Sequence, residues 1–407
     1  MVEGKQMFAR VLLVSITICV ATALATEARA GVPACGSNDT WFTSPLVNLA
    51  DIKHIVPLGN VNPSSGHTVP VRYTYFYPNG KVELRSPGNV ELVGAIYYVE
   101  KKQWEFHVRP CAEVTLFLNH IVAIPLGLED KLNGAPAVDL PGDDGAGNPS
   151  TLNIKLINIS LSPSELIGWA DNISNLDVGV VDKRKPPLQF ANPSRYTPNI
   201  TELLKSASLT GNETAQKAVP IVVPQALYSR CPIDYFADKD PLLQKLKDAS
   251  GAVAAGATLC NTHMQDVIGS AQGNWWSTLS ATNSFLNDKT AMSLTTWNVD
   301  PKVPVFSING TTPGSIPPGA YSFKVATVPG AKVNRQFSEI KDGDVYCFED
   351  VADMNGGPPL GAVILLRLER YRGASALNSM RIEFRKGVNK CNATRLGFST
   401  NAALLFR

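Results

Sequence analysis

The segment Pro57–Tyr77, PLGNVNPSSGHTVPVRYTYFY, joins a turn-rich loop to an aromatic run. Glycine, proline, asparagine and serine are frequent in its first half, which is typical of a loop, and His67 lies towards the end of that loop. Residues 72–77 are rich in tyrosine, phenylalanine and threonine, which favours a β-strand. Pro78-Asn79-Gly80 follows as a tight hairpin turn. The segment therefore predicts a loop that places His67 shortly before the start of a strand.

The same β-prone composition continues along the chain and predicts a mainly β fold. Further strands are expected up to residue 118, again between 155 and 181, and then from 303 to 406. Residues 134–150 are expected to form a surface loop because they are rich in Gly, Asp and Pro. We expect a signal peptide (1–30), a β core domain (31–190), a Pro-rich crossing with a helical insert (191–295) and a C-terminal antiparallel β domain (296–407).

Residues 1–30 have the features of a secretory signal peptide. Lys5 and Arg10 supply positive charge, residues 11–25 are apolar, and Ala28-Arg29-Ala30 matches the small-residue pattern of a cleavage site. No later stretch reaches the roughly 18 uninterrupted apolar residues of a membrane span. We therefore expect an exported protein, periplasmic or extracellular, without a membrane span after signal removal.

The cysteines after the signal segment predict a disulfide framework. They are Cys35, Cys111, Cys231, Cys260, Cys347 and Cys391. An even number in an exported protein favours disulfides, because these bonds persist in oxidising compartments. Closeness in sequence favours Cys231–Cys260 and Cys347–Cys391, which leaves Cys35–Cys111. The alternative is a set of isolated buried thiols.

Charge and motif content exclude several classes of function. The formal net charge is +2 and charged residues make up 18% of the chain, so nucleic acid and anionic membranes are not expected as partners. The short run Asp182–Lys185 is expected to be a solvated loop. The sequence lacks a G-x-S-x-G, a Walker loop, an H-E-x-x-H and a paired C-x-x-C.

Three separate segments carry a family resemblance. They are Ser65-Gly66-His67-Thr68, the run VTLFLNHI over residues 114–121, and ELIGW (165–169) followed by NLDVGV (175–180). Together they resemble the lysostaphin-type metallopeptidases, zinc enzymes that cut peptide cross-links in bacterial cell walls. The resemblance covers about residues 52–182 and implies a lysostaphin-type, duplicated hybrid motif-like β-sandwich or barrel core. A segment at residues 231–276 looks similar to uncharacterised exported bacterial proteins that carry this core.

The resemblance assigns roles to three residues. In the family, zinc is held by three protein ligands and keeps an open position for water. His67 corresponds to the first zinc ligand. His120 corresponds to a histidine that assists catalysis. Asp177 stands at one position of an H-x-H pair on a strand, and could bind a metal through oxygen.

The same comparison indicates that the zinc site is altered. Val71, Arg72 and Tyr73 stand where the family has an acidic ligand, and Arg72 would oppose a divalent cation. Asn175 replaces the other histidine of the pair and is a poor general base. His54 or Tyr73 could supply a substitute ligand. Zinc therefore stays a candidate cofactor at a degenerate site.

Two pairs of residues between 263 and 276 could also belong to a site. His263 and Asp266 are expected three residues apart on a helix surface. Trp275 and Trp276 are expected to pack between domains, with an aromatic platform for glycan as the alternative.

These patterns favour an exported cell-envelope protein. Its peptidase-like β domain would be a degenerate binding module for a cell-wall peptide or glycan, or for an envelope protein. The first alternative is an active zinc metalloendopeptidase that cleaves peptidoglycan cross-links. The second is a structural exported β protein without a ligand.

Overall fold

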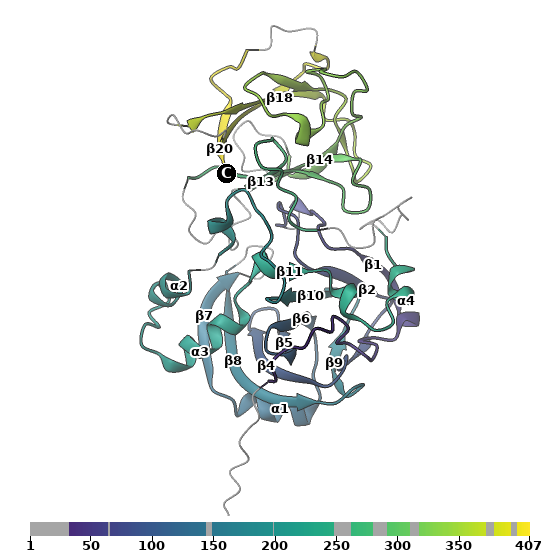
Figure 1. The fold of residues 1–407 in the computed structure, drawn as a ribbon, viewed down its shortest axis with the longest axis vertical. Coiled ribbons are helices and arrows are strands. Elements are labelled where there is room, and N and C mark those ends of the chain that lie inside the picture. Colours follow the sequence, from purple (N-terminus) through teal and green to yellow (C-terminus); the bar gives the residue numbers. More distant parts are fainter. Residues whose placement is uncertain are drawn as a thin grey trace, which may run out of the picture. The chain divides into compact units, whose positions relative to one another are not determined.

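The computed structural model describes residues 32–63, 66–143, 149–197, 199–247, 262–279, 291–309, 317–371, 378–391 and 397–407. Within these ranges strands outweigh helices (Figure 1). The strands form two nine-stranded sheets and one two-stranded sheet, whose pairings are antiparallel. The predicted mainly β class is therefore confirmed.

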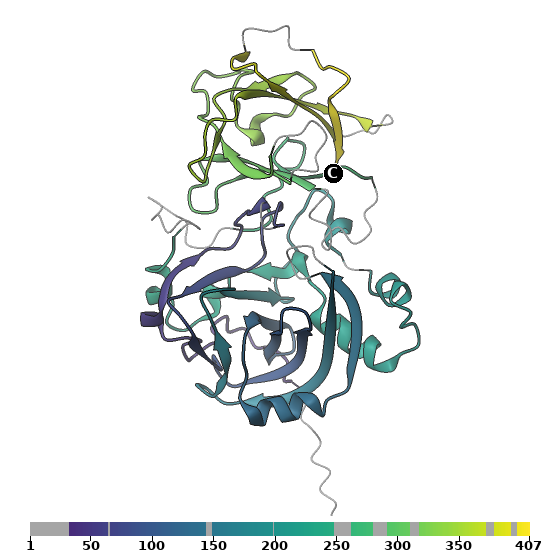
Figure 2. The same cartoon turned by 180° about the vertical axis from the view of Figure 1, so that it is seen from behind.

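The first large sheet has the order β1-β2-β10-β6-β5-β4-β8-β7, and β11 pairs with β10. Its curvature can be followed from both sides in Figure 1 and Figure 2. The strands are β1 (Ile52–Val56), β2 (Thr74–Pro78), β4 (Val90–Tyr98), β5 (Gln103–Cys111), β6 (Val114–Ile121), β7 (Ala137–Asp143), β8 (Pro149–Leu161), β10 (Leu176–Asp182) and β11 (Ser229–Arg230).

Side-chain alternation gives this sheet two different faces, because successive residues of a strand point to opposite sides. One face packs into an apolar core with Phe76, Phe106 and Leu116 among its members. The two-stranded sheet of β3 (Val82–Arg85) and β9 (Leu166–Ala170) contributes Leu84 and Ile167 to the same core. The other face carries tyrosine, histidine and carboxylate side chains, and it positions the candidate site.

The prediction of a loop over residues 134–150 is wrong in part. Helix α1 (Leu126–Asn133) ends just before it, and β7 then pairs with β8 along its whole length. Pro141 and Gly142 are tolerated there because β7 is the last strand of the sheet, where a missing amide hydrogen breaks no ladder on the outer side. The composition predicts a loop, but the segment pairs with β8 as an edge strand, where proline and glycine are accepted.

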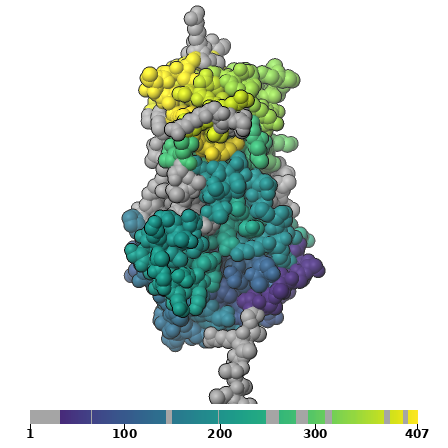
Figure 3. Space-filling model, turned by 60° about the vertical axis from the view of Figure 1, so that its left-hand side comes forward, coloured from purple at the N-terminus to yellow at the C-terminus, as the bar shows by residue number. Residues whose placement is uncertain are grey.

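The described part of the insert contains the short α-helices α2 (Ile200–Ser206), α3 (Glu213–Val222) and α4 (Asp240–Leu243). Asn199 and Asn212 cap α2 and α3, since their side chains accept hydrogen bonds from the amides of Glu202 and Ala215. The buried side of α3 packs with residues of β4, β7 and β8 in a separate apolar cluster. The teal surface of this helical segment is prominent in Figure 3.

The second large sheet begins earlier than the expected boundary at residue 296. Its order is β16-β18-β19-β20-β12-β13-β14-β15-β17, so β12 lies in its middle. The pairing partners β13 and β20 decide this membership, and one of them lies far along the chain. The strands are β12 (Gly273–Trp276), β13 (Ala291–Thr296), β14 (Pro304–Ile308), β15 (Gly319–Ser322), β16 (Tyr346–Phe348), β17 (Ala352–Asp353), β18 (Ala362–Glu369), β19 (Ser379–Lys386) and β20 (Ala403–Phe406).

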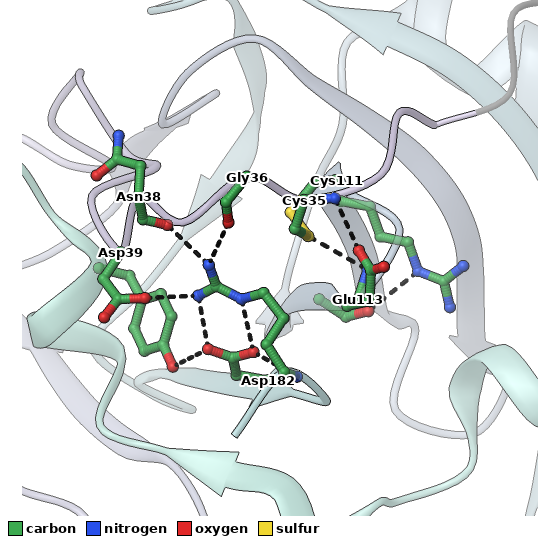
Figure 4. Close-up of a disulfide and its surroundings, with 11 residues drawn as sticks. Cys35, Gly36, Asn38, Asp39, Cys111, Glu113 and Asp182 are labelled. Atoms are coloured by element: carbon green, nitrogen blue, oxygen red, sulfur yellow. Dashed lines mark hydrogen bonds and ion pairs between the residues drawn. A yellow bond between two sulfur atoms is a disulfide. The ribbon is translucent and has the colours of Figure 1, made fainter. Parts of the chain in front are cut away.

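A disulfide and an arginine network anchor the first described residues, beginning at Cys35 (Figure 4). Cys35 is bonded to Cys111 at the end of β5. Arg184 forms a bidentate ion pair with the buried Asp182, in which Nε donates to Oδ1 (2.9 Å) and Nη2 donates to Oδ2 (2.7 Å). Its guanidinium also donates to the carbonyls of Gly36 and Asn38 and to the carboxylate of Asp39. The expectation of a solvated loop at 182–185 is therefore wrong in part, because Asp182 is buried at the end of β10 and Arg184 anchors distant backbone.

Of the other cysteines, Cys347 is bonded to Cys391, the pairing that sequence neighbourhood favours. Cys231 is also disulfide-bonded, and its expected partner Cys260 lies outside the described residues. In the described part of the chain, no helix combines the length and the apolar character that a membrane crossing requires.

Candidate functional site

A groove of about 550 Å³ lies on the polar and aromatic face of the first sheet. Residues from β2, β5, β6 and β10 form its floor, and residues from the loop at 60–72, from the insert and from β12 also line it. The structure places every cleft residue named from the sequence along this groove: His67, Arg72, Tyr73, His120, Asn175 and Asp177. Strand pairing thus brings together residues from three distant segments.

A row of tyrosines forms one wall of the groove. Tyr75 and Tyr77 alternate along β2, and Tyr73 immediately precedes the strand. All three line the groove and point away from the core. The rings of Tyr73 and Tyr75 meet edge to face with centroids 5.2 Å apart, and those of Tyr75 and Tyr77 are 6.4 Å apart. Each ring is half-buried. Aromatic rings that keep part of their surface exposed in a groove are suited to stacking against sugar or peptide groups.

A β-bulge aims His120 into the groove. Phe106 pairs with Leu118, but Trp104 pairs with Ile121, so β6 carries one extra residue at this point. The bulge keeps both Leu118 and Ile121 in the core. His120 takes the left-handed conformation, with φ of 68°, which is uncommon outside glycine. Regular alternation would have buried this side chain, so the bulge accounts for its exposure to the groove.

A hydrogen-bonded chain fixes the His120 ring. Gln103 Nε2 donates to Ser174 Oγ (2.6 Å), and Gln103 Oε1 accepts from His120 Nδ1 (2.8 Å). The other ring nitrogen, Nε2, lies 3.4 Å from Asp177 Oδ2. A protonated His120 would therefore form an ion pair with Asp177.

Asp177 is buried on the groove face of β10. Its neighbours Leu176 and Val178 belong to the core, so alternation turns its carboxylate the other way. Asn175, directly before the strand, has φ of 64° and ends the turn that leads into it. Asp177 is only 2% exposed, and its Oδ1 has no hydrogen-bond partner. Burial raises the pKa of Tyr77, and the negative charge of Asp177 raises it further.

A second buried network joins His107 to Tyr98 and Glu105, which line the groove. Glu105 Oε1 is 2.7 Å from His107 Nε2, and the hydroxyl of Tyr98 donates to Glu105 Oε2 (2.8 Å). Burial raises the pKa of Glu105, but the bond to His107 and the charges of His107 and Arg72 outweigh that effect, so the pKa is lowered overall. Glu105 therefore stays ionised near neutral pH, and its charge is held by these partners.

Arg72 lies over the aromatic floor of the groove. Its guanidinium carbon is 5.0 Å from the centroid of the Phe117 ring, a cation–π contact. The ring of Phe117 in turn covers Gly179, where an added Cβ would overlap it. At the same end, the hydroxyl of Tyr73 is 3.4 Å from His67 Nε2. Arg72 and His67 thus give this end of the groove a cationic and hydrogen-bonding character.

The described donor set does not fit a zinc site with three protein ligands. Among the described residues, three ligand-type side chains converge within 4.8 Å only at Cys35, Cys111 and Glu113, and both cysteines are consumed by their disulfide. His67 and Asp177 are not part of such a group. His54, considered as a substitute ligand, is stacked on Tyr77 with ring centroids 4.3 Å apart. The zinc ligand roles of His67 and Asp177 stay predictions.

The helix expected for His263 and Asp266 is absent. Residues 262–268 form no helix, and both side chains are buried. Asp266 accepts hydrogen bonds from the amides of Ala191 and Asn274, so distant backbone fixes its position. His263 lines the groove, and burial lowers its pKa to about 3.

The two tryptophans of β12 point to opposite faces. Trp275 lies in the core of the second sheet and is covered by Arg407, 4.2 Å from its ring centroid. Trp276 lines the groove beneath Arg195, whose guanidinium carbon is 4.5 Å from its ring centroid. Both side chains are buried, so neither offers an open platform.

The sequence interpretation missed several groove residues, namely Tyr75, Tyr77, Tyr98, Gln103 and Glu105. For those on β2 and β5 a signal was available, since the two-residue period of a strand places Tyr75 and Tyr77 beside Tyr73, and Glu105 beside Gln103. The sequence interpretation named His263 but expected it on a helix surface; the segment that carries it forms neither a helix nor a strand, and His263 lines the groove.

Comparison with protein-family models, with curated proteins and with solved structures gives no match for this chain. We therefore infer the function from the residues of the groove.

Proposed function

We propose that this protein is an exported cell-envelope binding protein whose groove takes a cell-wall peptide or glycan. The observation that carries the proposal is the half-buried row Tyr73, Tyr75 and Tyr77 along a groove of about 550 Å³. A ligand site of this kind combines apolar walls with a few convergent polar groups. Here the polar groups are His120, Asp177 and Arg72.

Binding is favoured over zinc-dependent hydrolysis by the ligand geometry. A lysostaphin-type endopeptidase would use His67 and Asp177 as ligands with His120 in catalysis, yet the described residues around them do not supply a third converging donor. Arg72 also lies along the groove, where its charge opposes a divalent cation. The resemblance to that family would then reflect a shared β scaffold whose groove is used for recognition.

Export is supported by the signal-like residues 1–30 and by the disulfides Cys35–Cys111 and Cys347–Cys391. Both bonds join residues distant in sequence, by 76 and 44 positions. A protein with such bonds is suited to the oxidising space where the cell wall lies.

The test is co-sedimentation of the purified mature protein with peptidoglycan sacculi, followed by titration with soluble wall fragments. Tyr73→Ala should weaken binding by about tenfold or more, as expected when an aromatic contact is truncated. Tyr228→Ala is the matched control, since Tyr228 is half-buried and does not line the groove. Equal binding by both variants, or no binding by the wild type, would refute the proposal and favour a structural role.

A further inference from the structure

Asp177 has a buried carboxyl group whose hydrogen-bonding capacity the described residues leave partly unused. Among the described residues, its Oδ1 is the only buried carboxylate oxygen without a hydrogen-bond partner. The residue is 2% exposed and lines the groove. Withdrawing a carboxylate oxygen from water without giving it a donor costs free energy, which a cationic donor from a ligand would recover.

The neighbours of Asp177 are suited to a nitrogen cation. Tyr75 is its direct cross-strand partner on β2, so the two side chains lie next to each other on the groove face. The charge of Asp177 also acts on both Tyr75 and Tyr77. Aromatic rings beside a carboxylate form a favourable environment for an ammonium group, which gains cation–π attraction in addition to the ion pair.

Asp177 is almost fully covered, and the side chain of its neighbour His120 is 20% exposed. A ligand group that reaches Asp177 must therefore displace some of the side chains that cover it. Small side-chain rotations at a binding surface are common and would admit a thin group. We expect a primary ammonium at the end of an unbranched chain to be preferred over a quaternary ammonium, because it is less bulky and keeps N–H donors for the carboxylate.

We propose that Asp177, Tyr75 and Tyr77 form a subsite for a primary ammonium group of the ligand. The inference rests on the proposed function and deepens it: the groove would select peptides that carry a free amino group, such as the side-chain amine of a diamino acid in an uncross-linked stem peptide. A cross-linked or acetylated amine has lost that positive charge and would be rejected.

Two probes test the subsite. The first is n-butylammonium chloride, compared with tetramethylammonium chloride and sodium chloride at equal ionic strength. A ligand that binds the folded state raises the melting temperature. Only n-butylammonium should do so, in the wild type and in Asp130→Asn, a charge-matched control at an exposed residue of α1 outside the groove. Asp177→Asn should abolish the rise.

The second probe is a synthetic stem tetrapeptide with a free lysine amine and its Nε-acetylated form. Calorimetry should give at least about tenfold tighter binding of the free amine, and Asp177→Asn should remove the difference. If Asp177→Asn fails to fold, the wild type's discrimination between the two peptides and between the two ammonium salts decides the question.

The outcomes separate the two proposals. Binding to sacculi without any preference for the free amine, and without selective stabilisation by n-butylammonium, overturns the subsite and leaves the envelope function standing. Selective stabilisation by n-butylammonium without binding to sacculi keeps the subsite and refutes the envelope function.

Discussion

Replacing His263 with Gln should make the stability of this protein less sensitive to mild acid. His263 is 3% exposed and packs beside the ring of Phe190, with centroids 5.4 Å apart. Neither ring nitrogen makes a hydrogen bond of normal geometry within the described residues. Burial, with a smaller contribution from the positive charge of Arg72, lowers its pKa from an ordinary 6.5 to about 3. The folded protein therefore holds this side chain neutral.

The sign and size of the effect follow from proton linkage. Between pH 3 and pH 6.5 the unfolded chain binds a proton at His263 that the folded chain does not bind, so the free energy of unfolding decreases as the pH decreases. The decrease begins near the unfolded pKa and is complete near the folded pKa. One pKa unit corresponds to about 1.4 kcal/mol, so lowering the pH to about 5 should cost roughly 2 kcal/mol at this residue.

The measurement is urea unfolding of the disulfide-bonded protein at about pH 7.5 and about pH 5, monitored by tryptophan fluorescence. The difference between the two pH values should be roughly 2 kcal/mol smaller in His263→Gln than in the wild type. Met264→Leu changes the adjacent side chain without removing a titrating group and should keep the wild-type difference. If wild type and His263→Gln lose equal stability on acidification, the folded protein does not hold His263 neutral and the reasoning is wrong.

Three further predictions concern the groove, the metal and the cysteines. Gly179→Ala should lower the free energy of unfolding, measured by urea denaturation, by about 1–3 kcal/mol, because the new Cβ overlaps the Phe117 ring. Gly36→Ala is the control and should be nearly neutral, because an added Cβ there meets open space. A neutral Gly179→Ala would contradict this packing. Elemental analysis of protein purified without chelator should give well under one zinc per chain and no cross-link hydrolysis, whereas stoichiometric zinc with chelator-sensitive cleavage lost in His120→Ala would establish the enzyme. Thiol titration of denatured, unreduced protein should give nearly zero, and two or more free thiols would refute the three-disulfide framework.

Much of the architecture could be predicted because it depends on local patterns. The aromatic run at 72–77 became β2, and the run around Ala362 became β18, since strand preference and alternation are properties of neighbouring residues. The errors occur where distant partners decide. Residues 137–143 have the composition of a loop but pair with β8, and β12 belongs to the second sheet because β13 and β20 flank it.

The sequence by itself determined which chemical groups are available: a histidine before β2, another at the end of β6, an acid on β10, and tyrosines at alternate positions. Tertiary structure alone decided what they can do together. The bulge that turns His120 outward depends on pairing between β5 and β6, and the burial of Asp177 and His263 depends on segments far away in the chain. The physical reason is that strand register and desolvation are set by neighbours in space, which the order of residues along one strand does not specify.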